Sequence, residues 1–280
     1  MTGIICLDKP RDMTSFMAVK RASRLLGVKK AGHTGTLDPM ATGVLVIMLG
    51  HSTRFIELLP EHKKSYTARV KLGVTTDTLD ITGTVLSESP VNTTLSQLLS
   101  VAESFKGDIL QTPPMFSALK KDGERLYDLA RKGIEIEREQ RKITIEKLDI
   151  YDFNGIEFSM DVTCSAGTYI RSLCDDIGRA LCCGAVMTDL RRTGANGFSI
   201  ESAVTLEELE RLVSENKAET IITSVETALM SYPKISVTGP QANRFYNGGA
   251  LDYARLHGEY PVGIYRVYSQ IGRASCRERV

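Results

Sequence analysis

The residues with the clearest potential for chemistry lie in a short loop that presents one carboxylate, Asp38. The loop spans residues 32–39 and reads GHTGTLDP, so two glycines give the backbone freedom and Pro39 keeps Asp38 extended. The apolar run 44–49 that follows is typical of a strand covered on both faces. A carboxylate that a rigid loop holds beside a buried strand can act as a nucleophile or a general base. A plain Asp-Pro turn is the alternative, but the pattern is longer than turn chemistry requires.

Arg171 is the second candidate, because its place in a predicted helix is unfavourable for a cation. Apolar residues at helical spacing over 170–181 follow Gly167, which predicts a helix with Thr168 as its N-cap. Arg171 then lies in the first turn, where the helix dipole disfavours positive charge, and this indicates a specific anionic partner. The alternative is an ion pair with Asp175, four residues later on the same helix.

Tyr66 is the third candidate, because it heads the apolar face of a predicted strand. Residues 65–72 alternate between polar and apolar side chains, which places Tyr66 on the same face as the apolar residues that follow it. A buried tyrosine hydroxyl needs a polar partner or a ligand. A core tyrosine at the end of a sheet is the alternative interpretation.

These segments and several others resemble the signature motifs of the TruB-type tRNA pseudouridine synthases. The resemblance extends in order over residues 3–270. The matching segments are LDKPRDMTS at 7–15, GHTGTLDPMATG at 32–43, KSY at 64–66, PPMFSALK at 113–120, GTYIRSL at 167–173 and LRR at 190–192. The chain departs from the family's pattern at Thr82, where the family has an aspartate. We therefore expect only a supporting role for Asp77 and Asp80.

The resemblance implies a role for five residues. Asp38 is the essential catalytic residue, and Arg171 pairs with it, which would lower the pKa of Asp38 and keep the carboxylate ionised. Tyr66 and Leu190 would pack on the two sides of the flipped base, with Tyr66 also a candidate proton carrier. His33 would fill the space that the base leaves in the RNA stack. The same motifs add three expected substrate or RNA contacts, which are Lys9 (in a Lys-Pro pair that supports the floor of the site), Thr36 and Tyr169.

The activity implied is the isomerisation of uridine 55 in the T-loop of elongator tRNAs to pseudouridine. The target base must leave the folded RNA, at a cost of a few kcal/mol for unstacking. No metal and no other cofactor is expected. The route stays open at this stage, since Asp38 could act at C1′ of the ribose, at C6 of the base, or through a glycal.

Two functions of other classes compete with this one. A glycosidase-like enzyme would need a second carboxylate as its acid or base. The candidates, none of which has a convincing setting in the sequence, are Asp77, Asp80, Asp175 and Asp176. A non-catalytic RNA chaperone that binds and unfolds the T-arm would fit the basic residues, but it would leave the pair of Asp38 and Arg171 without a use.

The distribution of charge is more informative than the formal net charge of +1. Residues 1–54 contain eight Lys or Arg against three Asp, giving +5, whereas residues 201–230 contain seven Glu against two cations, giving −5. On the helix predicted after residue 14, we expect Lys20 and Arg24 to contact phosphates, with a merely solvated face as the alternative. Lys120 lies in a Pro-rich segment at about 107–140 that we expect to form an RNA-clamping insertion.

The expected fold is α/β (α+β), with a mixed, largely antiparallel central sheet and flanking helices. We expect a catalytic domain at 1–232 and, from the resemblance, part of a small β-barrel-like PUA domain at 233–270. Residues 271–280, IGRASCRERV, look like the translation of a sequencing adapter. We set them aside as a non-native tail, which would leave the PUA domain truncated.

The location and partners are expected to be simple. No apolar run approaches the roughly 20 residues that span a bilayer, and Asp8 and Lys9 come too early for a signal peptide. The six cysteines form no CxxC pair and have no histidine at ligand spacing, so neither a metal nor a disulfide is predicted. We therefore expect a cytoplasmic protein, a monomer by its resemblance, that binds tRNA and no membrane.

Overall fold

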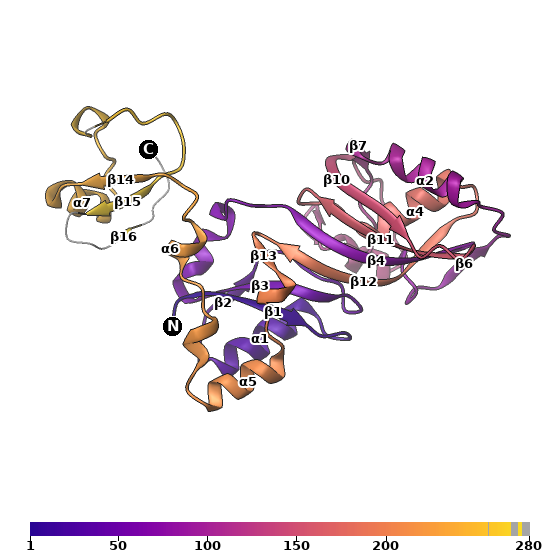
Figure 1. Ribbon diagram of the computed structural model, residues 1–280, viewed down its shortest axis with the longest axis horizontal. Helices are drawn as coiled ribbons and strands as arrows, with labels where there is room; N and C mark the ends of the chain where they lie inside the picture. The colour runs from indigo at the N-terminus through magenta and orange to yellow at the C-terminus, as the bar shows by residue number, and fades with distance from the viewer. Residues whose placement is uncertain (257, 270–273, 276–280) are drawn as a thin grey trace.

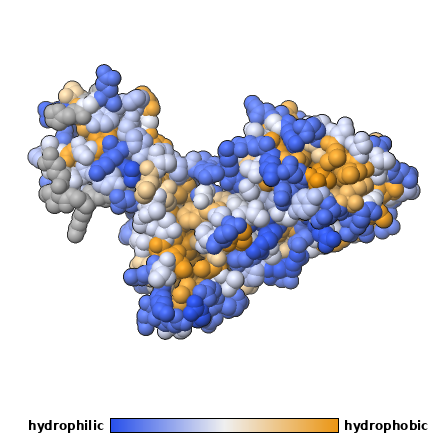
Figure 2. Space-filling model, in the orientation of Figure 1, coloured by the Kyte–Doolittle hydropathy of each residue, from blue (hydrophilic) through white to orange (hydrophobic). Residues whose placement is uncertain are grey.

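The computed structural model describes residues 1–256, 258–269 and 274–275. Figure 1 shows one elongated body built on a twisted sheet and a small C-terminal module that is joined to it through the segment around α6 (Val225–Ala228). None of the helices in this described part of the chain is long and apolar enough to cross a membrane. On the face shown in Figure 2, hydrophilic residues predominate and an apolar patch lies towards the end of the sheet where Figure 1 places α2.

The central sheet confirms the expected mixed, largely antiparallel architecture. Its strands follow the order β1 (Gly3–Lys9), β3 (Thr42–Leu49), β12 (Ala185–Ala195), β4 (Lys64–Leu72), β11 (Glu157–Cys164), β10 (Arg141–Tyr151) and β7 (Gly107–Gln111). Two short strands join this path, since β2 (Ala31–His33) pairs with β3 and β13 (Phe198–Ser199) pairs with β12. Every pairing among the described strands of this sheet is antiparallel except that of β3 with β12.

Helices cover the two halves of the sheet separately. Helices α1 (Ser15–Leu25) and α5 (Leu206–Ser214) pack on one face of β1 and β3, and the 3-10 helix η1 (Gly50–Leu58) packs on the other. Strand β3 is therefore buried on both faces, as its continuous apolar run predicts. Helices α2 (Leu95–Ser104) and α4 (Ile170–Ala180) cover the other half of the sheet and form the largest apolar core with β4, β10, β11 and β12.

The predicted N-cap agrees with the structure for α1 but not for α4. Helix α1 begins as expected, because the Thr14 hydroxyl accepts a hydrogen bond from the backbone N–H of Met17 at 3.1 Å. The prediction of Thr168 as the N-cap of α4 is wrong. The N-cap is Tyr169, and the Thr168 hydroxyl instead donates to the Ser165 carbonyl at 3.0 Å.

Smaller elements lie outside the central sheet. A hairpin of β5 (Val74–Thr76) and β6 (Val85–Glu88) follows β4, and the segment after β7 contains β8 (Lys120–Lys121), β9 (Glu124–Arg125) and α3 (Leu126–Arg131). Strand β7 pairs with β10 up to Gln111 opposite Arg141. Residues 107–111 of the predicted insertion at about 107–140 therefore form the edge strand of the sheet, and residues 112–140 leave it. The insertion as an RNA clamp stays a prediction.

The C-terminal module has its own core. Strands β14 (Lys234–Val237), β15 (Arg266–Ser269) and β16 (Ala274–Ser275) form a three-stranded sheet, and α7 (Gly239–Tyr246) packs beside it. Buried Ile235, Val237, Phe245 and Val267 belong to this core. The PUA interpretation of residues 233–270 stays a prediction. Of the supposed tail, residues 271–273 and 276–280 lie outside the described part of the chain.

Candidate active site

The loop that carries Asp38 leaves the sheet where two parallel strands separate. Strands β3 and β12 pair only through Thr42 with Arg191 and Gly43 with Arg192. Further along β3, its edge is taken by β2, whose residues 31–33 pair with 47–49. The loop after β2 therefore emerges between β2 and β12, at a gap in the sheet.

The side chain of Arg192 fills this gap. Its Nε donates to the carbonyl oxygen of Val44 at 2.6 Å, and its two terminal nitrogens donate to the carbonyls of Gly35 at 3.0 Å and Thr36 at 3.4 Å. Only 1% of Arg192 is exposed. A buried carbonyl without a donor costs about 1–3 kcal/mol, so Arg192 replaces the missing strand and fixes the course of the loop.

Two residues near the start of the chain hold the loop from its other side. The Ser15 hydroxyl accepts from the Leu37 N–H at 2.8 Å and lies 3.0 Å from the Leu37 carbonyl. The Lys9 ammonium donates to the carbonyls of Pro10 at 2.7 Å, Met13 at 2.6 Å and Pro39 at 3.2 Å. Lys9 has no exposed surface. We therefore correct its assignment as an RNA contact, since its ammonium supports the loop from inside the protein.

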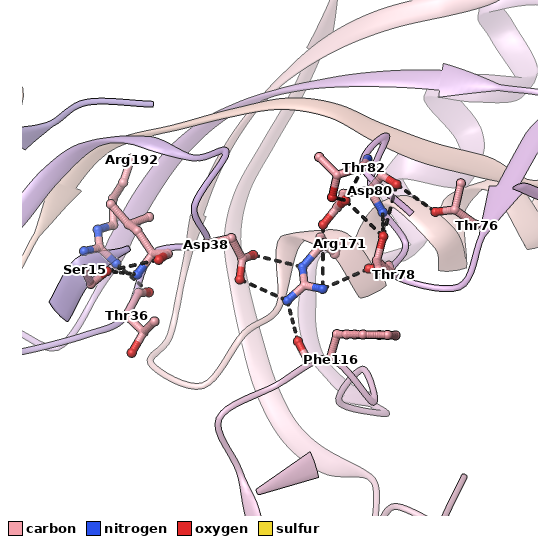
Figure 3. A network of polar contacts seen from close by, with 11 residues as sticks. Ser15, Thr36, Asp38, Thr76, Thr78, Asp80, Thr82, Phe116, Arg171 and Arg192 are labelled. Atoms are coloured by element: carbon pink, nitrogen blue, oxygen red, sulfur yellow. Dashed lines mark hydrogen bonds and ion pairs between the residues drawn. The ribbon is translucent and has the colours of Figure 1, made fainter. Parts of the chain in front are cut away.

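Asp38 and Arg171 form a two-pronged ion pair, which Figure 3 shows. Arg171 Nε lies 2.9 Å from Asp38 Oδ2, and Arg171 Nη2 donates to Asp38 Oδ1 at 3.2 Å. The guanidinium also donates to the carbonyls of Thr78 at 2.8 Å and Phe116 at 2.7 Å. Its rival partner Asp175 pairs instead with Arg179 at 2.7 Å. The exposed fraction is 5% for the Arg171 side chain and 33% for that of Asp38, so only the carboxylate faces the outside.

A second carboxylate backs the pair. Asp80 Oδ2 lies 3.8 Å from Arg171 Nη1, and Asp80 is 5% exposed. Its other oxygen accepts from the hydroxyl of Thr78 at 3.0 Å and from the backbone N–H of Thr82 at 3.0 Å. Asp80 is thus held in place on the side of Arg171 away from Asp38 (Figure 3), which suits the supporting role expected of it.

The pKa of Asp38 moves in the direction opposite to our expectation. Burial raises the pKa of Asp38 above its ordinary value, and the adjacent Arg171 opposes this shift without reversing it. The negative charge of Asp80 adds to the rise. The prediction of a lowered pKa is therefore wrong, because it counted the cation and left out the loss of water. The carboxylate is consequently more basic than that of an ordinary aspartate.

Tyr66 and Leu190 lie side by side on the face of the sheet next to the loop. Tyr66 pairs with Arg192 across β4 and β12, and Leu190 pairs with Ala68, so the side chains of all four point to one face. Tyr66 is 6% exposed and Leu190 is 5% exposed, and both belong to the apolar core that includes Leu37. Burial raises the pKa of Tyr66, so its hydroxyl stays protonated at neutral pH.

His33, Thr36 and Tyr169 surround this centre. The Nδ1 atom of His33 is buried and has no hydrogen-bond partner among the described residues, and burial together with Arg192 and Lys64 lowers the pKa of this imidazole. The side chain of Thr36 is exposed. Tyr169 is half-buried, and both its backbone N–H and its carbonyl bond to the side chain of Gln111, at 2.8 Å and 3.1 Å.

Three of the predicted residues, Lys20, Arg24 and Lys120, form no hydrogen bond or ion pair with Asp38 or Arg171 in the described part of the chain. Lys20 and Arg24 are exposed on α1. They lie one or more turns after Ser15, the first residue of the helix, which contacts the loop. Lys120 lines a cavity of about 560 Å³ in the insertion, together with Arg125, Asp128, Glu124, Arg131 and Lys132. Their roles in RNA binding stay predictions.

The structure adds residues that the sequence interpretation missed. Arg192 holds the loop through its hydrogen bonds to Gly35 and Thr36, yet from the LRR segment only Leu190 was predicted to be a site residue. Strand alternation places residues 190 and 192 on one face, and that spacing was the available signal. Ser15 was expected only as part of a helix start. The described residues contain no group of three or more His, Cys, Asp or Glu side chains that could hold a metal ion.

Comparison with known families covers most of the chain. Residues 23–170 match the N-terminal domain of the TruB family pseudouridylate synthases, and residues 171–230 match the tRNA pseudouridylate synthase B C-terminal domain. Neither match extends over the C-terminal module.

Individual relatives support the same grouping. A tRNA pseudouridine synthase B from Azoarcus sp. (strain BH72) is 48% identical over 249 residues, which covers 89% of this chain and 83% of the relative. One from Clostridium kluyveri is 45% identical over 269 residues, covering 96% and 92%. A chain in the crystal structure of a Cbf5-Nop10-Gar1 complex superposes with a TM-score of 0.73 at 28% identity, over 96% of this chain and 75% of that one. A chain from an H/ACA RNP bound to a substrate RNA containing 2′-deoxyuridine gives 0.70 at 26% identity, over 96% and 74%.

Proposed function

Since the chain belongs to the TruB family of pseudouridylate synthases, we propose that it converts uridine 55 in the T-loop of tRNA to pseudouridine. In this reaction the bond from ribose C1′ to N1 of uracil breaks, the base turns, and C1′ bonds to C5. The hydrogen on C5 leaves as a proton, and N1, freed from C1′, takes up a proton, so the product is an isomer of uridine. The observation that carries the proposal is the buried Arg171 that holds one half-buried carboxylate, Asp38, on a braced loop.

Each part of the site has a use in this reaction. Asp38 supplies the nucleophile or base, and its raised pKa makes the carboxylate a stronger base than an ordinary aspartate. Arg171 fixes the direction of both oxygens. Tyr66 and Leu190 offer the apolar surface against which an extruded uracil would pack, and the protonated Tyr66 hydroxyl can deliver a proton. His33, at the edge of the loop and neutral at pH 7, would stack in the RNA where the base was.

The insertion is the proposed clamp on the RNA. Its first part contacts the site directly, since the Phe116 carbonyl accepts from Arg171. Further on, Arg125 and Arg131 lie over the ring of Tyr127, at 5.6 Å and 5.4 Å from its centroid. Cations beside an aromatic ring suit a single-stranded or looped RNA. The Tyr127 backbone N–H donates to the carbonyl of Ser117 at 3.1 Å, so an RNA held by these residues would also restrain the adjacent Phe116, whose carbonyl contacts Arg171.

The partners and the location follow from the substrate. We propose that a monomer binds the T-arm, with the exposed basic residues of 1–54, such as Lys20 and Arg24, contacting phosphates, and that the reaction takes place in the cytoplasm, where tRNA matures.

Tritium release tests the proposed function. A T-arm minihelix with uridine labelled at C5 is incubated with the wild type and with Asp38→Asn, and binding of the same RNA is measured in parallel. We expect release by the wild type, none by the variant, and RNA binding by both. Release by both proteins would show that Asp38 is not the catalyst. No release by the wild type, with binding intact, would favour the RNA chaperone instead.

A further inference from the structure

One cation next to the catalytic loop has no use in the site as described so far. Lys64 begins β4 and is half-buried. Its ammonium lies against the backbone of the loop, because a Cβ atom added to Gly35 would come within 2.9 Å of Lys64 Nζ. The same Cβ would lie 3.6 Å from Arg192 Nη1. Two positive groups therefore meet at Gly35, three residues before Asp38.

The two cations differ in what they bind. Arg192 donates hydrogen bonds to the three carbonyls of Val44, Gly35 and Thr36. Lys64 Nζ makes no hydrogen bond and no ion pair with any residue that the structure describes. The neighbouring Lys63, by contrast, pairs with Glu146 at 2.8 Å. Burial and the nearby Arg192 lower the pKa of Lys64, against a smaller opposing effect of Cys164, and no Asp or Glu is among the groups that shift it.

The excess of positive charge around Lys64 also affects the neighbouring His33. The pKa of His33 is lowered first by burial and then by Arg192 and Lys64. Partly desolvated cations without a counter-ion are unfavourable unless an anion completes the site. A ligand that brings a negative charge to Gly35 would remove this cost.

The position of Lys64 relative to Tyr66 indicates which anion fits. Both residues point to the same face of β4, two positions and so about 7 Å apart along the strand. Tyr66 lies where the uracil would pack, and in RNA the ribose separates a base from its phosphates. We infer that Lys64 binds a backbone phosphodiester of the RNA directly beside the flipped uridine. This inference rests on the proposed function, because the ligand is part of the proposed substrate.

A neutral phosphate tests the contact. We would compare three T-arm minihelices that each carry one methylphosphonate, on the 5′ side of the target uridine, on its 3′ side, or in the stem as a control. Binding of each RNA is measured with the wild type, Lys64→Met, Lys64→Arg and the matched control Lys63→Met. One charge-assisted contact corresponds to about a tenfold change in affinity.

The expected pattern is specific to one phosphate. The wild type, Lys64→Arg and Lys63→Met should each lose about tenfold in affinity at one of the two positions beside the uridine, whereas Lys64→Met should lose less than about twofold there. With unmodified RNA, Lys64→Met should also reduce the slope of log affinity against log salt by about 0.7.

Three results would overturn the inference. They are equal sensitivity of Lys64→Met and the wild type, no sensitivity of the wild type at either position, and loss of sensitivity in Lys63→Met. Tritium release by the wild type from unmodified RNA is measured alongside. Its absence would refute the proposed function, whereas the binding pattern judges the phosphate contact by itself.

Discussion

The geometry of the Asp38–Arg171 pair can be tested by replacing Arg171 with lysine. The change keeps one positive charge but replaces a planar fork with a single ammonium, which cannot reach both carboxylate oxygens along parallel bonds. Arg171 now contacts both oxygens of Asp38 and the carbonyls of Thr78 and Phe116. A lysine ammonium placed at the carboxylate would lose at least two of these four contacts.

The size of the effect follows from these contacts. Two lost hydrogen bonds to a charged group correspond to about 3–6 kcal/mol. Asp38 is 33% exposed, so water can replace part of the loss on that side. We therefore expect the free energy of unfolding to fall by about 2–4 kcal/mol. A carboxylate displaced by about 1 Å from the reacting atoms also costs roughly a hundredfold in rate.

Arg171→Lys is to be compared with Arg179→Lys on the same helix, where the arginine side chain is 73% exposed and pairs with Asp175. Urea unfolding gives the stability of each variant, and tritium release at several pH values gives kcat and KM. We expect Arg171→Lys to lower kcat by about a hundredfold with little change in KM. The acid limb of its pH profile should stay in place, because the positive charge is kept. A change in kcat of less than about threefold would refute the positioning role, and a shifted acid limb would indicate that charge matters more than geometry.

Three further predictions concern the residues around the loop. Tyr66→Phe keeps the ring but removes the buried, protonated hydroxyl, so tritium release should fall by about a hundredfold if Tyr66 carries a proton and stay unchanged if it only packs against the base. Arg192→Met leaves three carbonyls without their donor. The free energy of unfolding, measured by urea titration, should therefore fall by at least about 3 kcal/mol. A loss below about 1 kcal/mol would show that other contacts hold the loop. Burial lowers the pKa of Lys9 from 10.5 to about 8, so despite its hydrogen bonds the charged form is less favourable in the folded than in the unfolded protein. Below about pH 8 this cost is fully present, and it is removed as the pH rises to 10.5. Unfolding titrations should therefore show the wild type gaining about 3 kcal/mol over Lys9→Met between these pH values, and a flat difference would contradict the lowered pKa.

Local patterns in the sequence determined much of the site. The glycines and the proline around Asp38 predicted a shaped loop, the alternation after Tyr66 predicted β4, and the helical spacing after Gly167 put Arg171 in the first turn of α4. These features depend on residues close together in the chain, where backbone preference and side-chain periodicity decide the outcome.

Only the tertiary structure decided how these pieces meet. The order of the sheet places β12 between β3 and β4, and this brings Arg192 to the carbonyls of Thr36 and Gly35, which lie 156 and 157 residues earlier in the chain. Nothing in the local pattern of residues 185–195 specifies those neighbours, because strand pairing is settled by the packing of the whole core. The rise in the pKa of Asp38 has the same origin. The sequence indicated Arg171, whose positive charge lowers the pKa of Asp38. Only the fold showed that burial of Asp38 raises this pKa by more than Arg171 lowers it.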